Sequence, residues 1–231
     1  MEVKLDRSAR RNAMTSLMVA SLLDLLDGPG VENVGAIVLS GAGKGFCAGS
    51  DLAGLSVMSQ EQRSDFEVAS GLLARRIMAC PIPVVAAVHG FAIGGGLTLA
   101  AACDIVVADP ASKWSLPEVP IGLFPAWGLE AVELRTGRPM ARRLSWGLDM
   151  LDGVAAQAAG LVDELADDPF SRGLEIAGKL AALPRQQAAS VKDYFAVGRT
   201  GKDADDHAVR HFTTATHSDE AMETFRRFGS R

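Results

Sequence analysis

The fold is decided by the stretch Pro83-Val84-Val85-Ala86-Ala87-Val88-His89-Gly90-Phe91-Ala92-Ile93-Gly94-Gly95-Gly96. Its segment Val84–Val88 is short and wholly apolar, which is typical of a buried β-strand. The three glycines then introduce an apolar helix at Leu97–Cys103, and Asp104–Ala108 follows as a further strand. This order of strand, loop, helix and strand predicts an α/β protein.

The same pattern extends outward in both directions. Gly35–Leu39 is another apolar run, and Lys113–Leu116 is a candidate short strand. A helix capped by Asn12 is expected to end at Gly28-Pro29-Gly30, and a polar helix is expected over Glu61–Met78. Beyond Gly128 the chain becomes Ala-rich and helical. Its last stretch, 205–228, is amphipathic and suited to covering a core or a neighbouring subunit.

Composition limits the classes of function. The chain has 231 residues, of which 48% are hydrophobic and 22% charged, as in a single folded domain. A net charge of −5 argues against a general affinity for nucleic acid or anionic membranes. The apolar runs are too short to cross a bilayer, and no signal peptide is recognisable. Three cysteines without metal-ligand spacing suggest a reducing cytoplasm.

Several motifs suggest a chemical function that the neighbouring residues in the sequence do not support. The loop at 41–46 resembles a phosphate-binding turn, but Gly45 stands where a P-loop needs Ser or Thr. His207 and His211 are spaced to share a metal on a helix, yet solvated or interface histidines explain them better. His89 fits a strand-end histidine, and no G-x-S-x-G nucleophile motif is present. No metal site is therefore expected.

The glycine triplet 94–96 is more informative. Three glycines between a buried strand and a helix leave backbone N–H groups uncovered, and the start of the helix adds partial positive charge. Such a turn can hold an oxyanion. Close packing between the helix and the strand explains the glycines equally well, so the triplet alone leaves both interpretations open.

A family resemblance extends over nearly the whole chain. It rests on an ordered set of motifs: Arg11–Met14, Phe46-Cys47-Ala48-Gly49-Ser50-Asp51-Leu52, Pro83–Gly96, Cys103-Asp104-Ile105, Pro117-Glu118 with Gly122 and Pro125, Ala159–Val162 and Glu220–Phe225. In this order the motifs resemble the enoyl-CoA hydratase/isomerase (crotonase) family. The family's first strand is shortened here to about Glu2–Leu5, and its basic C-terminal segment is reduced to Phe225–Phe228.

The resemblance implies a ββα superhelical core over residues 1–165 and a C-terminal helical region over 166–231. That region would form trimers, often stacked as hexamers, and cover the active site. The ligand implied is an acyl-CoA thioester of fatty acid metabolism, with no cofactor besides the CoA of the substrate. The far wall of the acyl pocket is expected from the helix at Met58–Arg76 and from a neighbouring subunit.

The resemblance also implies site residues. The backbone N–H groups of Ser50 and Gly95 would form the hole for the thioester oxygen, and Ala48–Ser50 would contact the adenine. Arg10 and Arg11 would approach the phosphates, although a solvated pair at a helix start explains them equally well. Further expected substrate contacts are Asp51, Gly94, Thr98 and Trp127, the last of which either narrows the acyl pocket or simply packs.

The family's hydratases use two glutamates, and this chain keeps one of them. Glu118 occupies the Pro-Glu position, whereas Thr98 stands at the other, where a hydroxyl orients water but is no base. A single glutamate suffices to move a double bond, which favours an isomerase. Glu130 is a weaker candidate for a second acid. Hydration, decarboxylation of a malonyl-type thioester and non-catalytic acyl-CoA binding remain alternatives.

Overall fold

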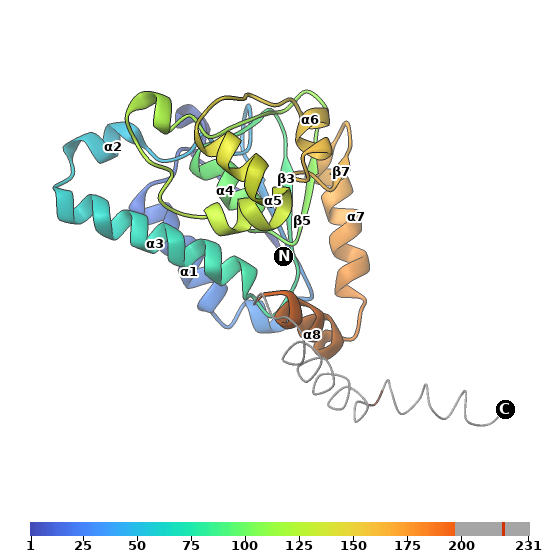
Figure 1. Cartoon of the computed structure of the whole chain (residues 1–231). Coiled ribbons are helices and arrows are strands. Elements are labelled where there is room, and N and C mark those ends of the chain that lie inside the picture. Colours follow the sequence, from blue (N-terminus) through green and yellow to red (C-terminus); the bar gives the residue numbers. More distant parts are fainter. Residues whose placement is uncertain (197–218, 220–231) are drawn as a thin grey trace, which may run out of the picture.

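Five parallel strands form the central sheet of the computed structural model, which describes residues 1–196 and 219 (Figure 1). They lie in the order β1 (Glu2–Leu5), β2 (Ile37–Gly41), β3 (Val84–Val88), β5 (Ile105–Ala108) and β7 (Glu164–Leu165). A second parallel sheet joins β4 (Phe91–Ile93) to β6 (Lys113–Ser115). Because all pairs are parallel, the chain must cross over between strands, and most crossovers contain helices.

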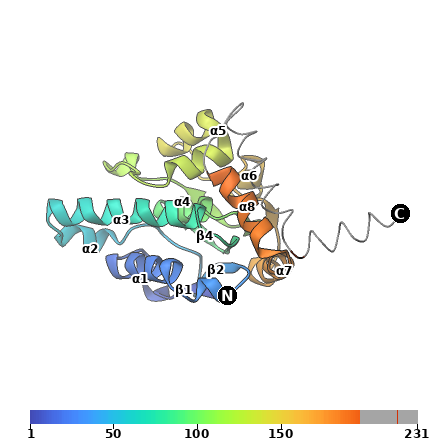
Figure 2. The same ribbon diagram turned by 90° about the horizontal axis from the view of Figure 1, so that it is seen from below.

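Eight α-helices accompany these strands in the described part of the chain. They are α1 (Ser16–Asp27), α2 (Leu52–Val57), α3 (Gln60–Met78), α4 (Gly95–Ala101), α5 (Leu129–Ser145), α6 (Gly153–Ala158), α7 (Pro169–Ala181) and α8 (Arg185–Ala196). Short 3₁₀ turns lie at Ser8–Arg10, Val31–Asn33 and Val119–Ile121. Figures 1 and 2 show α1 and α3 side by side, with α7 on the opposite side of the strands.

The strands alternate between two apolar clusters. Val85 and Ala87 of β3 belong to a small cluster with α7, where Ala177 is buried. Ala86 and Val88 belong instead to the main cluster, which includes residues of α1, α3 and α4. Since successive side chains of a strand point to opposite faces, the wholly apolar run of β3 follows from its burial on both sides.

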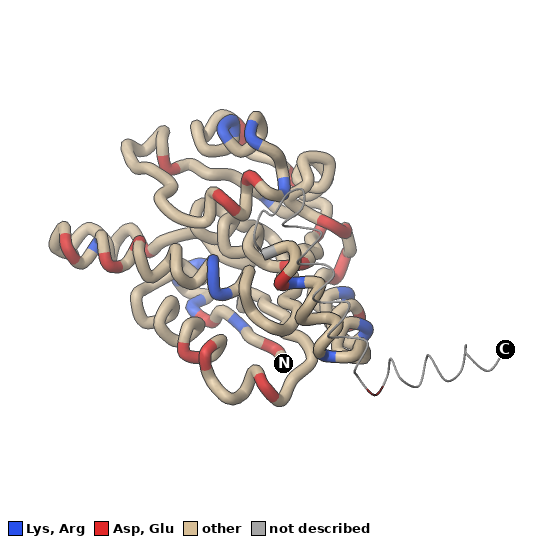
Figure 3. Tube along the Cα trace, turned by 60° about the horizontal axis from the view of Figure 1, so that its bottom comes forward, with Lys and Arg blue, Asp and Glu red and all other residues tan. Residues whose placement is uncertain are grey.

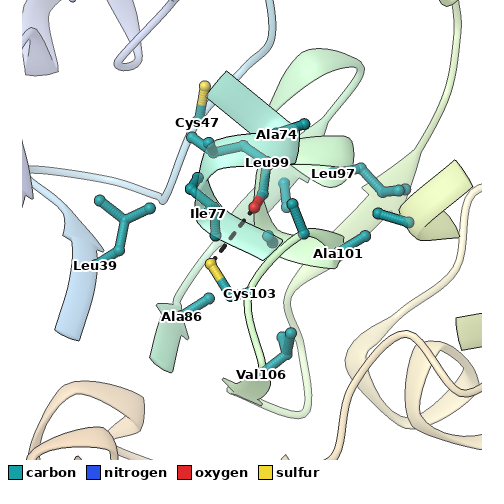
Figure 4. Packing of buried hydrophobic residues seen from close by; sticks show 14 of the residues in the cluster. Leu39, Cys47, Ala74, Ile77, Ala86, Leu97, Leu99, Ala101, Cys103 and Val106 are labelled. Atoms are coloured by element: carbon teal, nitrogen blue, oxygen red, sulfur yellow. Dashed lines mark hydrogen bonds between the residues drawn. The ribbon is translucent and has the colours of Figure 1, made fainter. Parts of the chain in front are cut away.

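The main cluster contains all three cysteines, and Figure 4 shows two of them, Cys47 and Cys103, among its apolar side chains. The thiol of Cys103 lies 3.5 Å from the carbonyl oxygen of Leu99, within α4 and its C-terminal turn. Cys47, Cys80 and Cys103 are all free thiols, and all are buried. Burial raises the pKa of Cys47 and of Cys103 to about 12.

The predicted strands at Glu2–Leu5 and Val84–Val88 are confirmed, but the start of the first helix is wrong. Thr15 caps α1 by accepting a hydrogen bond from the amide of Met18. Asn12 is fully buried with a φ of 55°, and its amide donates to the carbonyl oxygens of Ala42, Gly45 and Phe46 at 2.8–3.0 Å. Asn12 therefore holds the glycine-rich loop in place, because its side chain donates hydrogen bonds to loop carbonyl oxygens that are not paired within a strand.

The surface charges are mixed. Figure 3 shows Lys and Arg interspersed with Asp and Glu along the trace. Among the described helices, none is both long and apolar enough to span a membrane. Apart from residue 219, the amphipathic stretch 205–228, with His207 and His211, lies outside the described residues, as does the motif Glu220–Phe225.

Candidate active site

A cavity of about 720 Å³ lies at the point where the glycine-containing turns meet. Its walls come from residues 48–56, from α3, from the turn at 93–98 and from the loop at 117–127. The turn at 93–98 follows β4 and the loop at 117–127 follows β6, its parallel partner, while residues 48–56 follow Cys47, which forms a parallel bridge with Ala92 of β4. These three segments therefore meet at a common edge. Ligand sites of α/β proteins form at such an edge.

Two backbone amides at this edge have no hydrogen-bond acceptor within the described part of the chain. Around the first turn, Ala48 donates to Arg11, Met14 donates to Gly49 and Asp51 donates to Met14, with N···O distances of 2.8–3.0 Å. The amide between them, that of Ser50, donates to no described residue. The amide of Gly95, at the start of α4, likewise has no acceptor among the described residues.

The two turns touch each other. A methyl carbon added at Gly49, where φ is 89°, would lie 3.2 Å from the amide nitrogen of Gly95. Ser50 and Gly95 both line the cavity. Two unpaired N–H groups on adjoining turns, one of them at a helix start, form an electropositive spot suited to a carbonyl or enolate oxygen.

Glu118 lies directly against the second turn. A methyl carbon at Gly94 would be 2.5 Å from Oε1 of Glu118, so only glycine permits this approach. The side chain is half-buried, and its Oε2 is buried without a hydrogen-bond partner in the described structure. Desolvation raises the pKa of Glu118, and a hydrogen bond from its own backbone acts in the opposite direction. A carboxylate of raised pKa with one oxygen free of hydrogen bonds suits proton transfer near neutral pH.

Thr98 brings no second carboxylate to the site. It lines the cavity but is only 1% exposed, and its hydroxyl donates to the carbonyl oxygen of Gly95 at 3.1 Å. Gly128 packs so closely that a methyl carbon there would be 2.5 Å from Cβ of Thr98. The threonine is therefore held in place by α4 and by the loop that follows Trp127.

A second carboxylate enters the cavity from α3, where no sequence motif marks it. Glu67 of α3 is half-buried and lines the same cavity as Glu118. Burial raises its pKa, and the charge of Glu118 raises it further. Glu67 borders the buried face of α3, which carries Phe66 and Ser70, but the sequence of the helix does not show that this face covers the loop of Glu118.

Of the other residues expected to contact the substrate, some line the cavity and some lie outside it. Ala48 and Trp127 line the cavity, and the Trp127 ring lies against Gly95, where a methyl carbon would be 2.8 Å from Cζ2. Arg10 and Arg11 are exposed and lie outside the cavity-lining set. Glu130 lies on α5 and lines a neighbouring cavity rather than that of Glu118.

Asp51 has a structural task beside the cavity. Its carboxylate accepts from the amide of Gly54 at 3.3 Å and so caps α2. It also pairs with Arg7 at 3.0 Å. The Arg7 hydrogen bond lowers the pKa of Asp51, which keeps this carboxylate ionised.

The described residues contain no group of three or more His, Cys, Asp and Glu that could hold a metal ion. What the cavity offers is a pair of amides, a carboxylate beside them and apolar walls at Leu55 and Trp127. This arrangement can stabilise negative charge on a carbonyl oxygen while a base acts on the neighbouring carbon.

The fold and this pocket define a class of α/β protein with two free amides and a carboxylate at the carboxyl ends of its parallel strands. Over residues 1–229 the sequence matches the profile described as "Enoyl-CoA hydratase/isomerase", and the chain belongs to this family. It is 36% identical over 187 residues to a probable enoyl-CoA hydratase of Mycobacterium tuberculosis, covering 79% of this chain and 72% of the relative.

Further relatives agree with this family. A crotonyl-CoA hydratase of Syntrophomonas wolfei is 32% identical over 179 residues, covering 74% of this chain and 69% of that protein. The crystal structure of an enoyl-CoA hydratase from Mycobacterium smegmatis superposes with a TM-score of 0.92 at 26% identity, covering 99% of this chain and 91% of that one. The expected crotonase-like α/β core is thereby confirmed, and the protein is an acyl-CoA-processing enzyme of this family.

Proposed function

We propose that the protein moves the double bond of an enoyl-CoA thioester through an enolate, with Glu118 as the proton carrier. The observation that supports this most directly is the position of Glu118, which is half-buried and lies against Gly94, next to the free amide of Gly95, with its Oε2 lacking a hydrogen-bond partner among the described residues. The amides of Ser50 and Gly95 bind the thioester oxygen, and their interaction strengthens as negative charge develops on it.

The proton balance needs only one carboxylate. Ionised Glu118 removes a proton from C2 of a 3-enoyl thioester, and the electrons of the C–H bond move into the enolate. Protonated Glu118 then returns the proton to C4, and the double bond shifts from C3–C4 to C2–C3. No other reactant is consumed, and Thr98 takes no part in either transfer.

Hydration is the second candidate, and the names of the relatives favour it. Adding water to a 2-enoyl thioester also passes through the enolate, so the amides and Glu118 keep their roles. The additional requirement is a base that activates water, which the hydroxyl of Thr98 cannot provide near neutral pH.

The remaining features of the proposal concern binding and assembly. Ala48–Ser50 contact the adenine of CoA, the exposed Arg10 and Arg11 bind its phosphates, and Asp51 orders the loop between them. Trp127, whose ring lies against Gly95, bounds the acyl chain. The enzyme works in the cytoplasm as a homotrimer or hexamer and uses no cofactor besides the CoA of its substrate.

The test is Glu118→Gln, which keeps the shape of the side chain and removes the base. The variant is expected to lose exchange of the C2 proton with deuterium from solvent by at least about 100-fold, since general acid–base catalysis contributes that much. Glu130→Gln is the matched control and should exchange normally. Undiminished exchange in Glu118→Gln, or tight thioester binding without any turnover in the wild type, would reject the proposal.

A further inference from the structure

We propose that Glu67 is the second proton-transferring carboxylate of this cavity and that it activates the water that adds to C3 of a 2-enoyl thioester. The inference rests on the proposed function, because it requires the enolate site at Ser50, Gly95 and Glu118. It assigns to α3 the role that position 98 cannot fill.

The first support is the placement of α3. A methyl carbon at Gly71 would lie 3.6 Å from Cβ of Trp127, so α3 packs directly on the loop that carries Glu118. Glu67 lies four residues before Gly71, on the same face of the helix. Both Glu67 and Glu118 line the cavity of about 720 Å³. The two carboxylates thus line one cavity from different elements, α3 and the loop at 117–127.

The second support is that Glu67 has no hydrogen-bond or ion-pair partner among the described residues. The nearest cation along α3, Arg63, is engaged elsewhere: its Nε donates to the carbonyl oxygen of Leu55 at 2.8 Å and its Nη2 to that of Ser56 at 3.2 Å. Arg63 therefore caps the C-terminal end of α2 and forms no ion pair with Glu67. A carboxylate with an exclusively structural role would be expected to hold such a partner.

The third support is electrostatic. The charge of Glu118 raises the pKa of Glu67, which already stands above the usual range because of burial. A negative charge on one carboxylate disfavours ionisation of the other, so a pair that holds one proton is stabilised relative to a pair that is fully ionised. Addition of water requires a pair that holds one proton, since one group accepts a proton and the other donates one.

Water adds across the C2–C3 double bond with two proton transfers. Ionised Glu67 takes a proton from water while the water oxygen forms a bond to C3. The π electrons of the C2–C3 double bond move onto the thioester oxygen, where the amides of Ser50 and Gly95 stabilise the enolate. Protonated Glu118 then delivers its proton to C2, giving the 3-hydroxyacyl thioester. Proton exchange with solvent restores both carboxylates.

The experiment compares Glu67→Gln with Glu61→Gln, an exposed glutamate of the same helix, in the full-length protein. Crotonyl-CoA hydration is followed by loss of the conjugated-thioester absorbance, and exchange of the C2 proton is followed in deuterated solvent. Glu67→Gln is expected to lose hydration by about 100-fold or more and to retain C2 exchange within about threefold. Its thioester affinity and its Tm should not fall, and Glu61→Gln should behave as the wild type.

Each other outcome decides against the inference. Hydration within twofold of the wild type in Glu67→Gln would overturn it, as would a wild type that isomerises without hydrating. Parallel loss of hydration and C2 exchange would place Glu67 in the enolate step instead of at water. Failure of the proposed function is recognised separately, because Glu118→Gln would then keep its exchange.

Discussion

At the scale of single residues, the approach of Glu118 to the turn depends on the missing side chain of Gly94. The backbone there has a φ of 55°, which side chains disfavour, and a methyl group would collide with Oε1 of Glu118 at 2.5 Å. The same residue thus allows the turn to form and leaves room for the carboxylate.

Gly94→Ala is therefore expected to lower turnover by about 100-fold or more, because a displacement of the carboxylate by about 1 Å costs that much. The strained backbone should also cost about 1–3 kcal/mol of unfolding free energy. Gly178→Ala in α7, where no atom lies within 4 Å of the added methyl group, is the control and should be neutral or slightly stabilising. Normal turnover in Gly94→Ala would show that Glu118 does not work from this position.

Glu67 and Glu118 should also affect stability as pH changes. The folded-state pKa of each lies above the unfolded value, so their protonated forms are favoured by folding. Their contribution is fully present below the unfolded pKa, about 4.3, and is lost as pH rises through the folded pKa. Glu67→Gln should then be more stable than the wild type at about pH 8 and similar at about pH 4.

Urea unfolding at both pH values checks this, with Glu61→Gln as the control. A Glu67→Gln variant less stable than the wild type at about pH 8 would contradict the stated sign. The measurement is independent of turnover, so it tests the electrostatic environment of Glu67 even in an inactive preparation.

The sequence identified one of the two cavity carboxylates. Glu118 was found because it lies in a recognisable motif, and Thr98 was found because it departs from one. Glu67 has no motif of its own, and it comes close to Glu118 only because α3 packs against Trp127 in the folded chain. A pattern in one helix does not reveal which loop that helix covers.

At the scale of elements, strands buried on both faces were predicted well and short elements were not. The apolar run of β3 and the first strand β1 have the expected bounds. The helix α2 spans only Leu52–Val57, too short for a periodic pattern, and depends on the Asp51 cap and on Arg63. The strand β4 has three residues and is defined by its pairing with β6.

The helix α8 is attached through a buried cation. Lys192 donates from Nζ to Oδ2 of Asp104 at 2.6 Å and to the carbonyl oxygen of Ile82 at 3.0 Å. The same carboxylate oxygen accepts from the amide of Val84 at 2.7 Å. This network joins α8 to the starts of β3 and β5.

Lys192→Met is expected to cost about 2 kcal/mol of unfolding free energy, because it removes charged hydrogen bonds at a buried position. The double variant with Asp104→Asn should cost less than the sum of the two single variants. Exposed Lys179→Met should stay within about 0.5 kcal/mol of the wild type. Additive effects in urea unfolding would show that Lys192 and Asp104 act independently.

At the scale of the whole molecule, an apolar surface remains uncovered by the described residues. Leu134, Val191 and Phe195 are 62%, 61% and 73% exposed, and they line a second cavity of about 510 Å³ between α5 and α8. Apolar patches of this kind commonly mark interaction sites. We expect that assembly of the chain involves this side.

Sedimentation equilibrium should give a mass three or six times 24.2 kDa. Val191→Asp should reduce that mass, whereas Val68→Asp, at a similarly exposed position of α3, should leave it unchanged. A wild-type particle of 24.2 kDa would contradict the expected trimer.

The burial of Cys47, Cys80 and Cys103 has a practical consequence for work on this enzyme. A thiol enclosed by the core, with a pKa of about 12 at Cys47 and Cys103, does not present a thiolate to an alkylating reagent. Iodoacetamide should modify the native chain only when the interior is transiently exposed to solvent. The modification rate then reports how often the folded protein opens, without any engineered probe.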